Sequence, residues 1–385
     1  MMMPPRHRAI WLGAVLLFLL PLLVLVATGY SETGRYGMLS AARVMLAELG
    51  LTAPSAEHDI LKLRLLRALC AVGVGGSLAL AGAMTQGLFR NPLAEPGLLG
   101  VGSGAMLGAV VAIALLGGYG PDMWTRPQAG DGLAAAAWTR VVALGLVPLL
   151  AFVGALAATF TIYRLATRQG RISVAGLLLT GLAINALLGA LMAALQVLLL
   201  PDWQASRAII AWGFGTFDDR SLFHIVVVWS GALVALAAMP LVALELDLLA
   251  GGEDDAATLG ADPARVKTVV LACVALATAA SVSVSGQIAF VGLLVPHVTR
   301  LLVGPHHRRL LPVAFLAGAT LLLLVVVFQH GLCPVLAEWV AAGSPRLAVA
   351  CRRVTSMQPG ALTSLLGAPF FLYLLLRQGR RVLGG

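Results

Sequence analysis

Residues 82–104, GAMTQGLFRNPLAEPGLLGVGSG, decide the fold, because a polar break with two prolines interrupts two long apolar runs. Proline lacks a backbone N–H and disfavours continuation of a helix, so the chain is expected to turn here. Glycine and other small residues in 97–104 then open the next run, and small residues permit close helix packing. The residues expected to shape this tight loop are Asn91, Pro92, Pro96 and Gly97.

Composition places the chain in the membrane. Hydrophobic residues make up 59%, charged residues 11%, and the mean hydropathy is +0.93, whereas about a quarter of the residues in soluble proteins are charged. A membrane-spanning helix needs about 20 apolar residues, and a helix satisfies its own backbone hydrogen bonds in hydrocarbon. The prediction is an all-α polytopic membrane protein with one transmembrane domain over residues 1–385. About ten spans are expected, near 10–30, 65–89, 98–117, 141–162, 174–200, 222–249, 268–284, 288–303, 310–328 and 361–376.

The first apolar stretch resembles a signal peptide, but it continues past Pro21 to Tyr30 without a small-residue cleavage site, so we expect a retained helix. Cysteines are few. Cys70 and Cys273 fall within apolar runs, whereas Cys333 and Cys351 share one connecting segment. The latter two are either a disulfide, if they face an oxidising compartment, or two thiols.

Charge alone does not orient the chain. With both termini in the cytoplasm, about fourteen of the 26 lysines and arginines fall on that side, which is a thin excess for the positive-inside rule. Arg64 and Arg67 are three residues apart and share one helix face at the mouth of the second span. They are candidates to receive an acidic partner, and the alternative is that they extend to lipid headgroups.

Several stretches together resemble the FecCD/BtuC-like permease family of bacterial ABC importers for ferric siderophores, haem and cobalamin. They are 64–104, then GGEDDAATLG at 251–260, SGQIAFVGLLVPHVTRLLVGPHHRRLLP at 285–312, and LLGAPFFLYLLL at 365–376, in the family's order. The resemblance implies type II importer architecture with ten helices, both termini cytoplasmic, in a bacterial inner membrane. It also implies four kinds of partner: a second copy of the chain, two cytoplasmic ATPases, a periplasmic or lipid-anchored binding protein that Arg64 and Arg67 would meet, and a metal-chelate substrate.

The segment near 247–267 is the expected coupling loop to the ATPase. Three acids, Glu253, Asp254 and Asp255, open an alanine-rich stretch, and acids favour a helix N-terminus. A glycine at 260 would end this short helix. Ala257 stands where the family often has arginine. The proposed ATPase-coupling residues are Gly252, Glu253, Asp254, Asp255, Ala256, Leu259 and Gly260.

Nucleotide chemistry is not expected in this chain. A P-loop needs Gly-Lys-Ser/Thr after a glycine-rich turn, and the only lysines, Lys62 and Lys267, lie outside such a motif. ATP and Mg would therefore be used by a partner ATPase, and no cofactor is expected here.

The fifth span carries a stripe of small and polar residues along one helix face, and such faces turn toward a cavity or a neighbouring helix. It is either a wall of the transport pathway or a packing seam with an interhelical hydrogen bond. Met84 and Gln86 are expected at an inner gate. The full set of pathway candidates is Met84, Gln86, Gly181, Asn185, Gly189, Met192 and Gln196.

The histidines invite a metal site, but the acidic or cysteine ligands expected beside them are missing from the local sequence, so none is predicted. His306 and His307 precede two arginines and fit a basic inner cap. Gly292, Pro296 and His297 match the family's signature, and Pro296 with His297 is expected to shape a turn near the motor.

The ninth and tenth spans depart most from the family. Val326 and His330 stand where an aspartate and an arginine are common, and residues 331–355 form a longer connector, expected to be an outward loop whose Arg346, Arg352 and Arg353 supplement docking. Residues 118–138 are expected to form another outward loop.

Two other classes compete with an ATP-driven importer of an iron chelate. A secondary transporter would carry ionisable residues in its spans or inverted repeats, and a membrane enzyme would need a buried catalytic cluster. Neither feature is evident in the sequence. The chelate is not determined by these residues, and cobalamin is the alternative to a ferric siderophore or haem.

Overall fold

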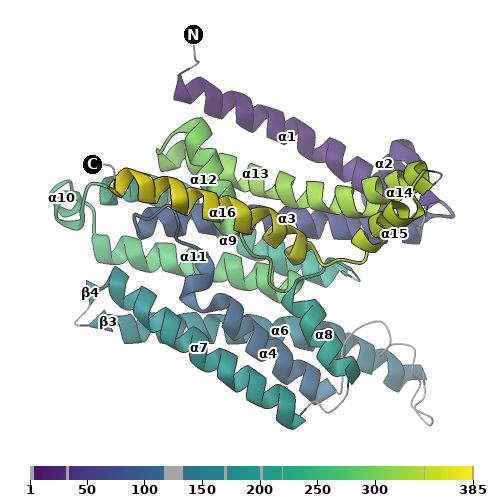
Figure 1. Ribbon diagram of the computed structural model, residues 1–385, viewed down its shortest axis with the longest axis horizontal. Coiled ribbons are helices and arrows are strands. Elements are labelled where there is room, and N and C mark those ends of the chain that lie inside the picture. Colours follow the sequence, from purple (N-terminus) through teal and green to yellow (C-terminus); the bar gives the residue numbers. More distant parts are fainter. Residues whose placement is uncertain are drawn as a thin grey trace.

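The computed structural model describes residues 4–31, 34–116, 133–168, 171–199, 203–218, 220–341 and 343–383, and this part of the chain is almost entirely helical (Figure 1). Two short antiparallel hairpins, β1–β2 and β3–β4, are the strands there. The long helices are α1 (Pro5–Gly29), α3 (His58–Leu88), α4 (Val101–Leu116), α6 (Leu133–Ala166), α7 (Val174–Leu199), α9 (Leu222–Leu249), α11 (Pro263–Ser285), α12 (Val291–Val303), α13 (His307–Val327) and α16 (Pro359–Leu383).

Short elements connect or cap these helices. They are β1 (Tyr30–Ser31), β2 (Gly34–Arg35), α2 (Gly37–Glu48), the 3-10 turn η1 (Pro96–Leu99), β3 (Thr167–Arg168), β4 (Arg171–Ile172), α8 (Trp203–Gly213), α10 (Glu253–Thr258), the π-helical turn η2 (Phe328–Leu332), α14 (Cys333–Ala341) and α15 (Pro345–Val354).

Among the described residues, each of the ten predicted stretches is helical. Seven helices there are long and apolar enough to cross a bilayer, and α4, α12 and the first part of α16 are shorter apolar helices. Each falls on one of the ten stretches predicted from the sequence. The surface of this bundle is apolar: on α7, Leu182 is 70% exposed and Val197 is 82% exposed. Such a surface suits hydrocarbon rather than water.

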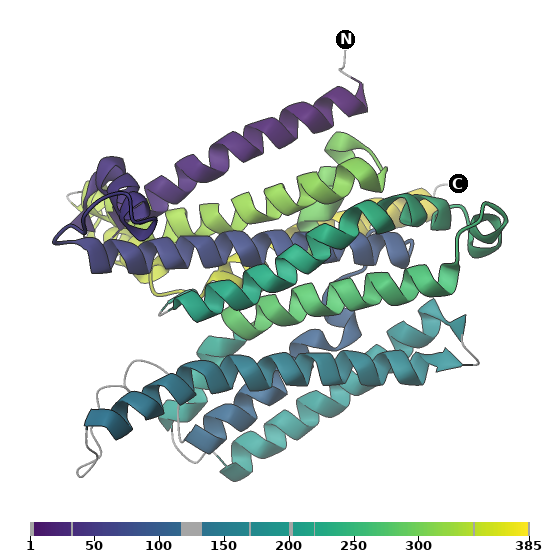
Figure 2. The ribbon, with the colours of Figure 1, turned by 180° about the vertical axis from the view of Figure 1, so that it is seen from behind.

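The helices form two groups, and the helices α9 and α11 lie between these groups (Figures 1 and 2). In one group α4 contacts α6 and α7, and in the other α13 contacts α1, α3 and α12. Between them, α9 and α11 pack on each other and on α3, and α11 also contacts α4 and α6. The helix α11 is therefore the main link between the two groups.

Glycines let the helices touch backbone to backbone. A Cβ added at Gly75 on α3 would lie 2.2 Å from the carbonyl oxygen of Gly318 on α13, and one at Gly82 would lie 1.8 Å from that of Gly292 on α12. Side chains larger than hydrogen do not fit at these crossings. Close approach of this kind replaces the hydrophobic driving force that helices lack in lipid.

Both termini lie toward the same end of the bundle as α10, while α2, α14 and α15 lie at the opposite end (Figures 1 and 2). This arrangement agrees with the even number of spans predicted.

Two expected loops differ in the structure. Most of the segment 331–355 is helical, because η2 continues α13 into α14, which ends at Ala341, and α15 (Pro345–Val354) packs against α14. Residues 118–132 of the second expected loop lie outside the described residues, and the chain is already helical from Leu133. Cys333 is buried and Cys351 is half-buried, and both are free thiols.

Candidate coupling site and transport pathway

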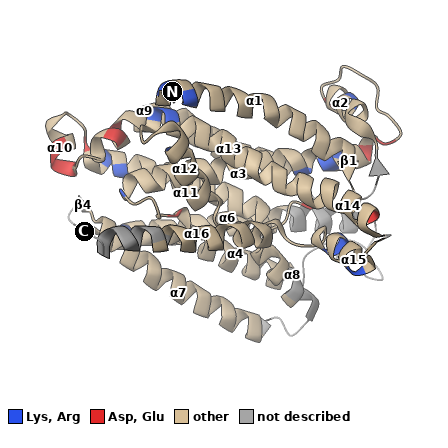
Figure 3. Cartoon of the chain, turned by 45° about the horizontal axis from the view of Figure 1, so that its top comes forward, with Lys and Arg blue, Asp and Glu red and all other residues tan. Residues whose placement is uncertain are grey.

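The short helix predicted in the coupling segment is confirmed as α10. Gly252 precedes the helix with φ 138°, and Gly260 follows it with φ 88°. At both ends of the helix, therefore, glycine adopts a backbone conformation that other residues rarely adopt. Ala256 is fully buried toward the bundle, whereas Leu259 is 68% exposed. Figure 3 shows acidic residues on α10 at the end of the molecule. An exposed, acid-bearing helix held on one side is suited to receive a partner.

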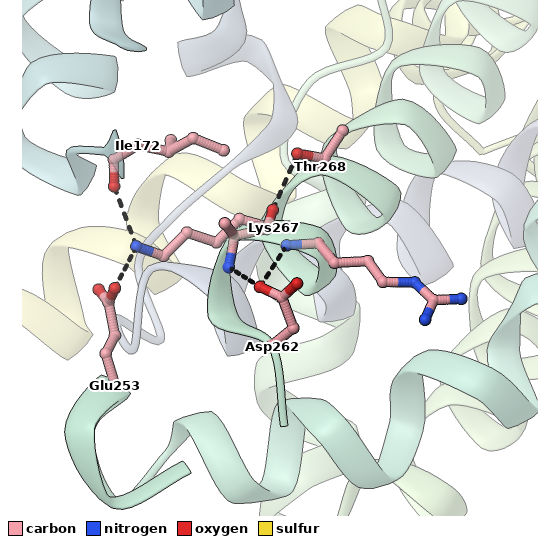
Figure 4. Close-up of polar contacts among 7 residues, drawn as sticks. Ile172, Glu253, Asp262, Lys267 and Thr268 are labelled. Carbon is pink, nitrogen blue, oxygen red and sulfur yellow. Dashed lines mark hydrogen bonds and ion pairs between the residues drawn. The ribbon is translucent and has the colours of Figure 1, made fainter. Parts of the chain in front are cut away.

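Lys267 holds α10 in place (Figure 4). Its Nζ atom, on the first turns of α11, lies 2.5 Å from Oε2 of Glu253 and donates a second hydrogen bond of 2.9 Å to the carbonyl oxygen of Ile172 in β4. The Lys267 residue is only 5% exposed. A buried ammonium group is costly unless it is paired and hydrogen-bonded, and these two oxygens meet that need.

The start of α11 is capped in the usual way. Oδ1 of Asp262 accepts hydrogen bonds from the backbone N–H groups of Ala264 and Arg265, at 3.0 and 3.1 Å (Figure 4). Thr268 then returns a hydrogen bond to the carbonyl of Ala264 at 2.8 Å. These contacts fix the point at which the chain leaves α10 and enters α11.

The other stem of α10 is fixed through Asp247, near the end of α9. Its Oδ1 atom accepts hydrogen bonds from the backbone N–H of His307, at 2.9 Å, and from the ring Nδ1 of the same residue, at 2.6 Å. His306 lies farther off, with Nδ1 3.7 Å from Oδ2. The structure thus places His307 as a buried partner of Asp247, while His306 is mostly exposed.

The predicted turn after α3 is confirmed. Asn91 accepts a hydrogen bond from the N–H of Leu93 at 2.9 Å, and Pro92 follows it within the turn. Glu95 reaches across to α12, where its Oε1 accepts from the N–H of Phe290 at 3.2 Å. Burial raises the pKa of Glu95, and the hydrogen bond from Phe290 opposes that rise. The loop therefore ties the end of α3 to the start of α12.

Pro296 does not form a turn, so that prediction is wrong: both Pro296 and His297 lie inside α12. Because proline has no N–H, the carbonyl of Gly292 loses its helical partner, and this carbonyl is the one that lies against Gly82. Pro96 also lies against Gly292. His297 is buried, with its ring 6.2 Å from that of Phe370 on α16 in an edge-on arrangement.

The stripe on α7 divides into two parts. A Cβ at Gly181 would lie 2.1 Å from the carbonyl of Leu98, and Asn185 hydrogen-bonds Ser103 and, at 3.4 Å, the carbonyl of Gly97. These residues form the packing seam with an interhelical hydrogen bond, which was one of the two alternatives. Farther along the stripe, no described atom outside the neighbouring backbone of α7 lies within 4 Å of a Cβ built at Gly189, and Met192 and Gln196 are half-buried.

Met84 and Gln86 do not face open space in this structure. Met84 is fully buried, and Gln86 is 2% exposed with its Nε2 donating to the carbonyl of Leu293 at 3.0 Å. Both side chains are enclosed by helices of their own chain, so an inner gate at these residues would require helix movement.

Arg64 and Arg67 lie at the end opposite α10, and both are engaged within the chain. Arg64 is 5% exposed, donates to the carbonyl of Thr28 at 3.3 Å, and stacks over the ring of Tyr36 at 5.1 Å. Arg67 pairs with Asp218 at 2.6 Å and keeps 23% of its side chain exposed. Only Arg67 therefore retains appreciable contact with the surroundings.

Sequence reasoning missed three of these partners: Lys267, Asp247 and Asp218. Lys267 had one available signal, since it is one of two lysines in a chain with 26 basic residues. His307 lies 60 residues from Asp247, and Ile172 lies 95 residues from Lys267, so no local pattern reveals these two contacts.

Comparisons with known proteins agree with this architecture. The model of the FecCD transport family matches residues 15–340. The chain is 40% identical to the cobalamin import system permease protein BtuC of Halobacterium salinarum over 321 residues, 81% of this chain and 72% of that protein. It is 37% identical to the hemin transport system permease protein HmuU of Yersinia pestis, over 94% of this chain and 95% of that protein.

A solved structure is also similar. It is described as an inward-facing conformation of a metal-chelate type ABC transporter, with a TM-score of 0.66 and 27% identity, covering 95% of this chain and 98% of that one. The sequence match extends over most of the chain, and the helical bundle agrees with it. This chain belongs to the FecCD transport family, whose members are the membrane permease subunits of ABC importers.

Proposed function

We propose that this chain imports an iron chelate, a ferric siderophore or haem, across the bacterial cytoplasmic membrane, using work from a partner ATPase. The observation that carries the proposal is α10, a short helix fixed by Glu253 and Lys267 on one side and exposed at Leu259 on the other. A helix held in this way can transmit a push from a soluble motor into the bundle without bending.

The proposed assembly has two copies of the chain, two ATPases at the α10 end and one periplasmic or lipid-anchored binding protein at the opposite end. Both termini and α10 would face the cytoplasm. Pairing of two identical chains is supported by the need for a wide route and by the prevalence of two-fold assemblies. ATP and Mg would be held by the ATPase, and this chain would bind no cofactor of its own.

The proposed mechanism is alternating access. ATP draws the two ATPases together, the α10 helices move with them, and the central route changes the side that it faces. In this proposal Gly252 to Gly260 receive the motor, the open part of the α7 stripe at Gly189, Met192 and Gln196 lines the route, and Arg67 meets the binding protein. Met84 and Gln86 would reach the route only in another conformation.

Cobalamin is the second candidate cargo, because a relative named for cobalamin import is 40% identical to this chain. The hemin permease, which aligns over almost the whole chain, supports the iron chelate. Both cargoes are bulky metal chelates, and the binding protein would choose between them.

The test is uptake by proteoliposomes that contain the chain with its ATPase and binding protein. Radiolabelled ferric siderophore, haemin and cyanocobalamin are supplied separately, with ATP or with a non-hydrolysable analogue inside. ATP-dependent uptake of an iron chelate is expected. Uptake of cyanocobalamin alone would move the assignment to cobalamin, and transport by the isolated chain along an ion gradient would overturn the proposal.

A further inference from the structure

We infer that Lys267 is a positioning residue that makes the coupling helix α10 and the α6–α7 hairpin move as one body. This inference rests on the proposed function and assigns the route by which movement of α10 enters the bundle. Its basis is the pair of oxygens that meet Lys267 Nζ: Oε2 of Glu253 on α10, at 2.5 Å, and the carbonyl of Ile172 in β4, at 2.9 Å (Figure 4).

The two oxygens that accept hydrogen bonds from Lys267 belong to different parts of the fold. Glu253 is the first residue of α10, whereas Ile172 lies in the β3–β4 hairpin that connects α6 to α7, 95 residues from Lys267. One ammonium group on α11 therefore joins three elements. The pairing of Thr167 with Ile172 in turn fixes β4 to the end of α6.

The packing shows what would move with α10. The helices α4, α6 and α7 contact one another, and they meet the remainder of the bundle chiefly through α11. Lys267 lies at the α10 end of this link. A displacement of α10 would reach α6 and α7 through a hydrogen bond, and so reach the part of α7 at Gly189 that is open.

Burial argues that the contact is specific. Lys267 is 5% exposed, so its charge is stabilised by these partners more than by water. Glu253 keeps 43% of its side chain exposed, which means that this carboxylate can be removed without opening a buried cavity. The pair thus offers two different variants. Lys267→Met fills the buried site with an apolar side chain, and Glu253→Ala removes a partly exposed carboxylate but leaves the ammonium group with the carbonyl of Ile172.

The experiment compares Lys267→Met with Arg265→Met in proteoliposomes of the complete importer. Arg265 is two residues earlier on α11, is exposed, and bonds to Asp262 only through its backbone N–H among the contacts described. Each variant loses one positive charge near α10. We expect Lys267→Met to hydrolyse ATP while moving at least about tenfold less chelate per ATP, the loss associated with one charge-assisted hydrogen bond. Arg265→Met should match the unmodified importer.

A distance measurement separates coupling from simple destabilisation. Spin labels at Gly251→Cys, beside α10, and Leu179→Cys, on α7, are placed in a Cys351→Ser background, since the other cysteines are buried. The importer is assembled from one labelled and one unlabelled copy of the chain, so that only the distance within one chain is measured. We expect one narrow distance distribution in both the nucleotide-free and the ATP-trapped importer, and a broadened or shifted one in Lys267→Met.

Glu253→Ala provides a second route if Lys267→Met does not fold, and it should broaden the same distribution. Equal coupling and equal distances in Lys267→Met and Arg265→Met, or an unchanged distribution in Glu253→Ala, would overturn the inference while leaving the importer assignment intact. Failure of the unmodified importer to couple ATP to uptake would instead overturn the proposed function.

Discussion

The carboxylate of Asp247, near the end of α9, accepts two hydrogen bonds from His307, the first residue of α13: one from the backbone N–H and one from the imidazole ring. It therefore acts as a helix cap supplied from a distant element. Since α9 leads directly into α10, this contact fixes one stem of the coupling helix to α13, as Lys267 fixes the other stem to β4.

Removal of this carboxylate should destabilise the protein. Asp247→Ala leaves the N–H and the ring of His307 without an acceptor in a buried site, at a cost of about 1–3 kcal/mol for each group left unsatisfied. We expect the melting temperature in detergent to fall by several degrees. Glu245→Ala, two residues earlier on α9, is the control and should leave the melting temperature unchanged. Equal melting of the two variants would show that the Asp247 cap contributes nothing to stability.

The glycine crossings should be far less tolerant than the open face of α7. Gly82→Ala places a methyl group 1.8 Å from the carbonyl of Gly292, so α3 and α12 must separate. At Gly189→Ala the added methyl group meets no described atom outside the neighbouring backbone of α7, and alanine favours a helix over glycine by about 1 kcal/mol. We expect aggregation of Gly82→Ala and a monodisperse Gly189→Ala on size-exclusion chromatography. A monodisperse Gly82→Ala at normal yield would contradict the close crossing.

The pair Arg67 and Asp218 separates docking from stability. A partly exposed ion pair contributes roughly 0–1 kcal/mol, so neither Arg67→Ala nor Asp218→Ala should change the melting temperature appreciably. If Arg67 meets an acidic site on the binding protein, Arg67→Ala should lower the affinity of the permease for the binding protein about tenfold. Asp218→Ala should leave this affinity unchanged or raise it. Affinity measured by biolayer interferometry with the permease in nanodiscs tests this. An equal loss of affinity in both variants would mean that the ion pair acts only by ordering the segment between α8 and α9 that carries Asp218.

Much of the fold could be predicted because its signals are local. Apolar length and proline breaks locate the ten helices, and the acids with Gly260 locate α10, because a helix terminus depends on adjacent residues. Gly181 and Asn185 could not be assigned in advance, since a small, polar stripe suits either a cavity or a seam, and only the position of Leu98 and Ser103 decides between them.

Two hydrogen bonds that organise the site could not be predicted from the sequence, and the reason is physical. Gln86 bonds Leu293 across 207 residues, and Lys267 bonds Ile172 across 95. Their partners are backbone carbonyls, which every residue carries, so no side-chain pattern identifies them. Pro296 was expected to shape a turn because it matches the family's signature, whereas it lies inside α12 and the carbonyl that it releases lies against Gly82 of α3.

Leu259 should be a main anchor for the ATPase. It is 68% exposed at the end of α10, beside exposed Asp254 and Asp255, and it leads into a glycine turn that holds it away from the bundle. Full burial of a leucine at an interface stabilises binding by roughly 1.5–3 kcal/mol, so Leu259→Ala should weaken co-purification of the ATPase about tenfold or more.

The matched control is Leu182→Ala, because Leu182 is 70% exposed on the apolar face of α7, away from α10. Truncation of either leucine removes the same atoms from a similarly exposed position, and neither should change the melting temperature. Only Leu259→Ala should lose the ATPase, and the loss should be relieved by raising the ATPase concentration, since binding rather than folding is affected. If Leu259→Ala retains the ATPase as well as Leu182→Ala does, the ATPase must bind another part of the α10 end of the bundle.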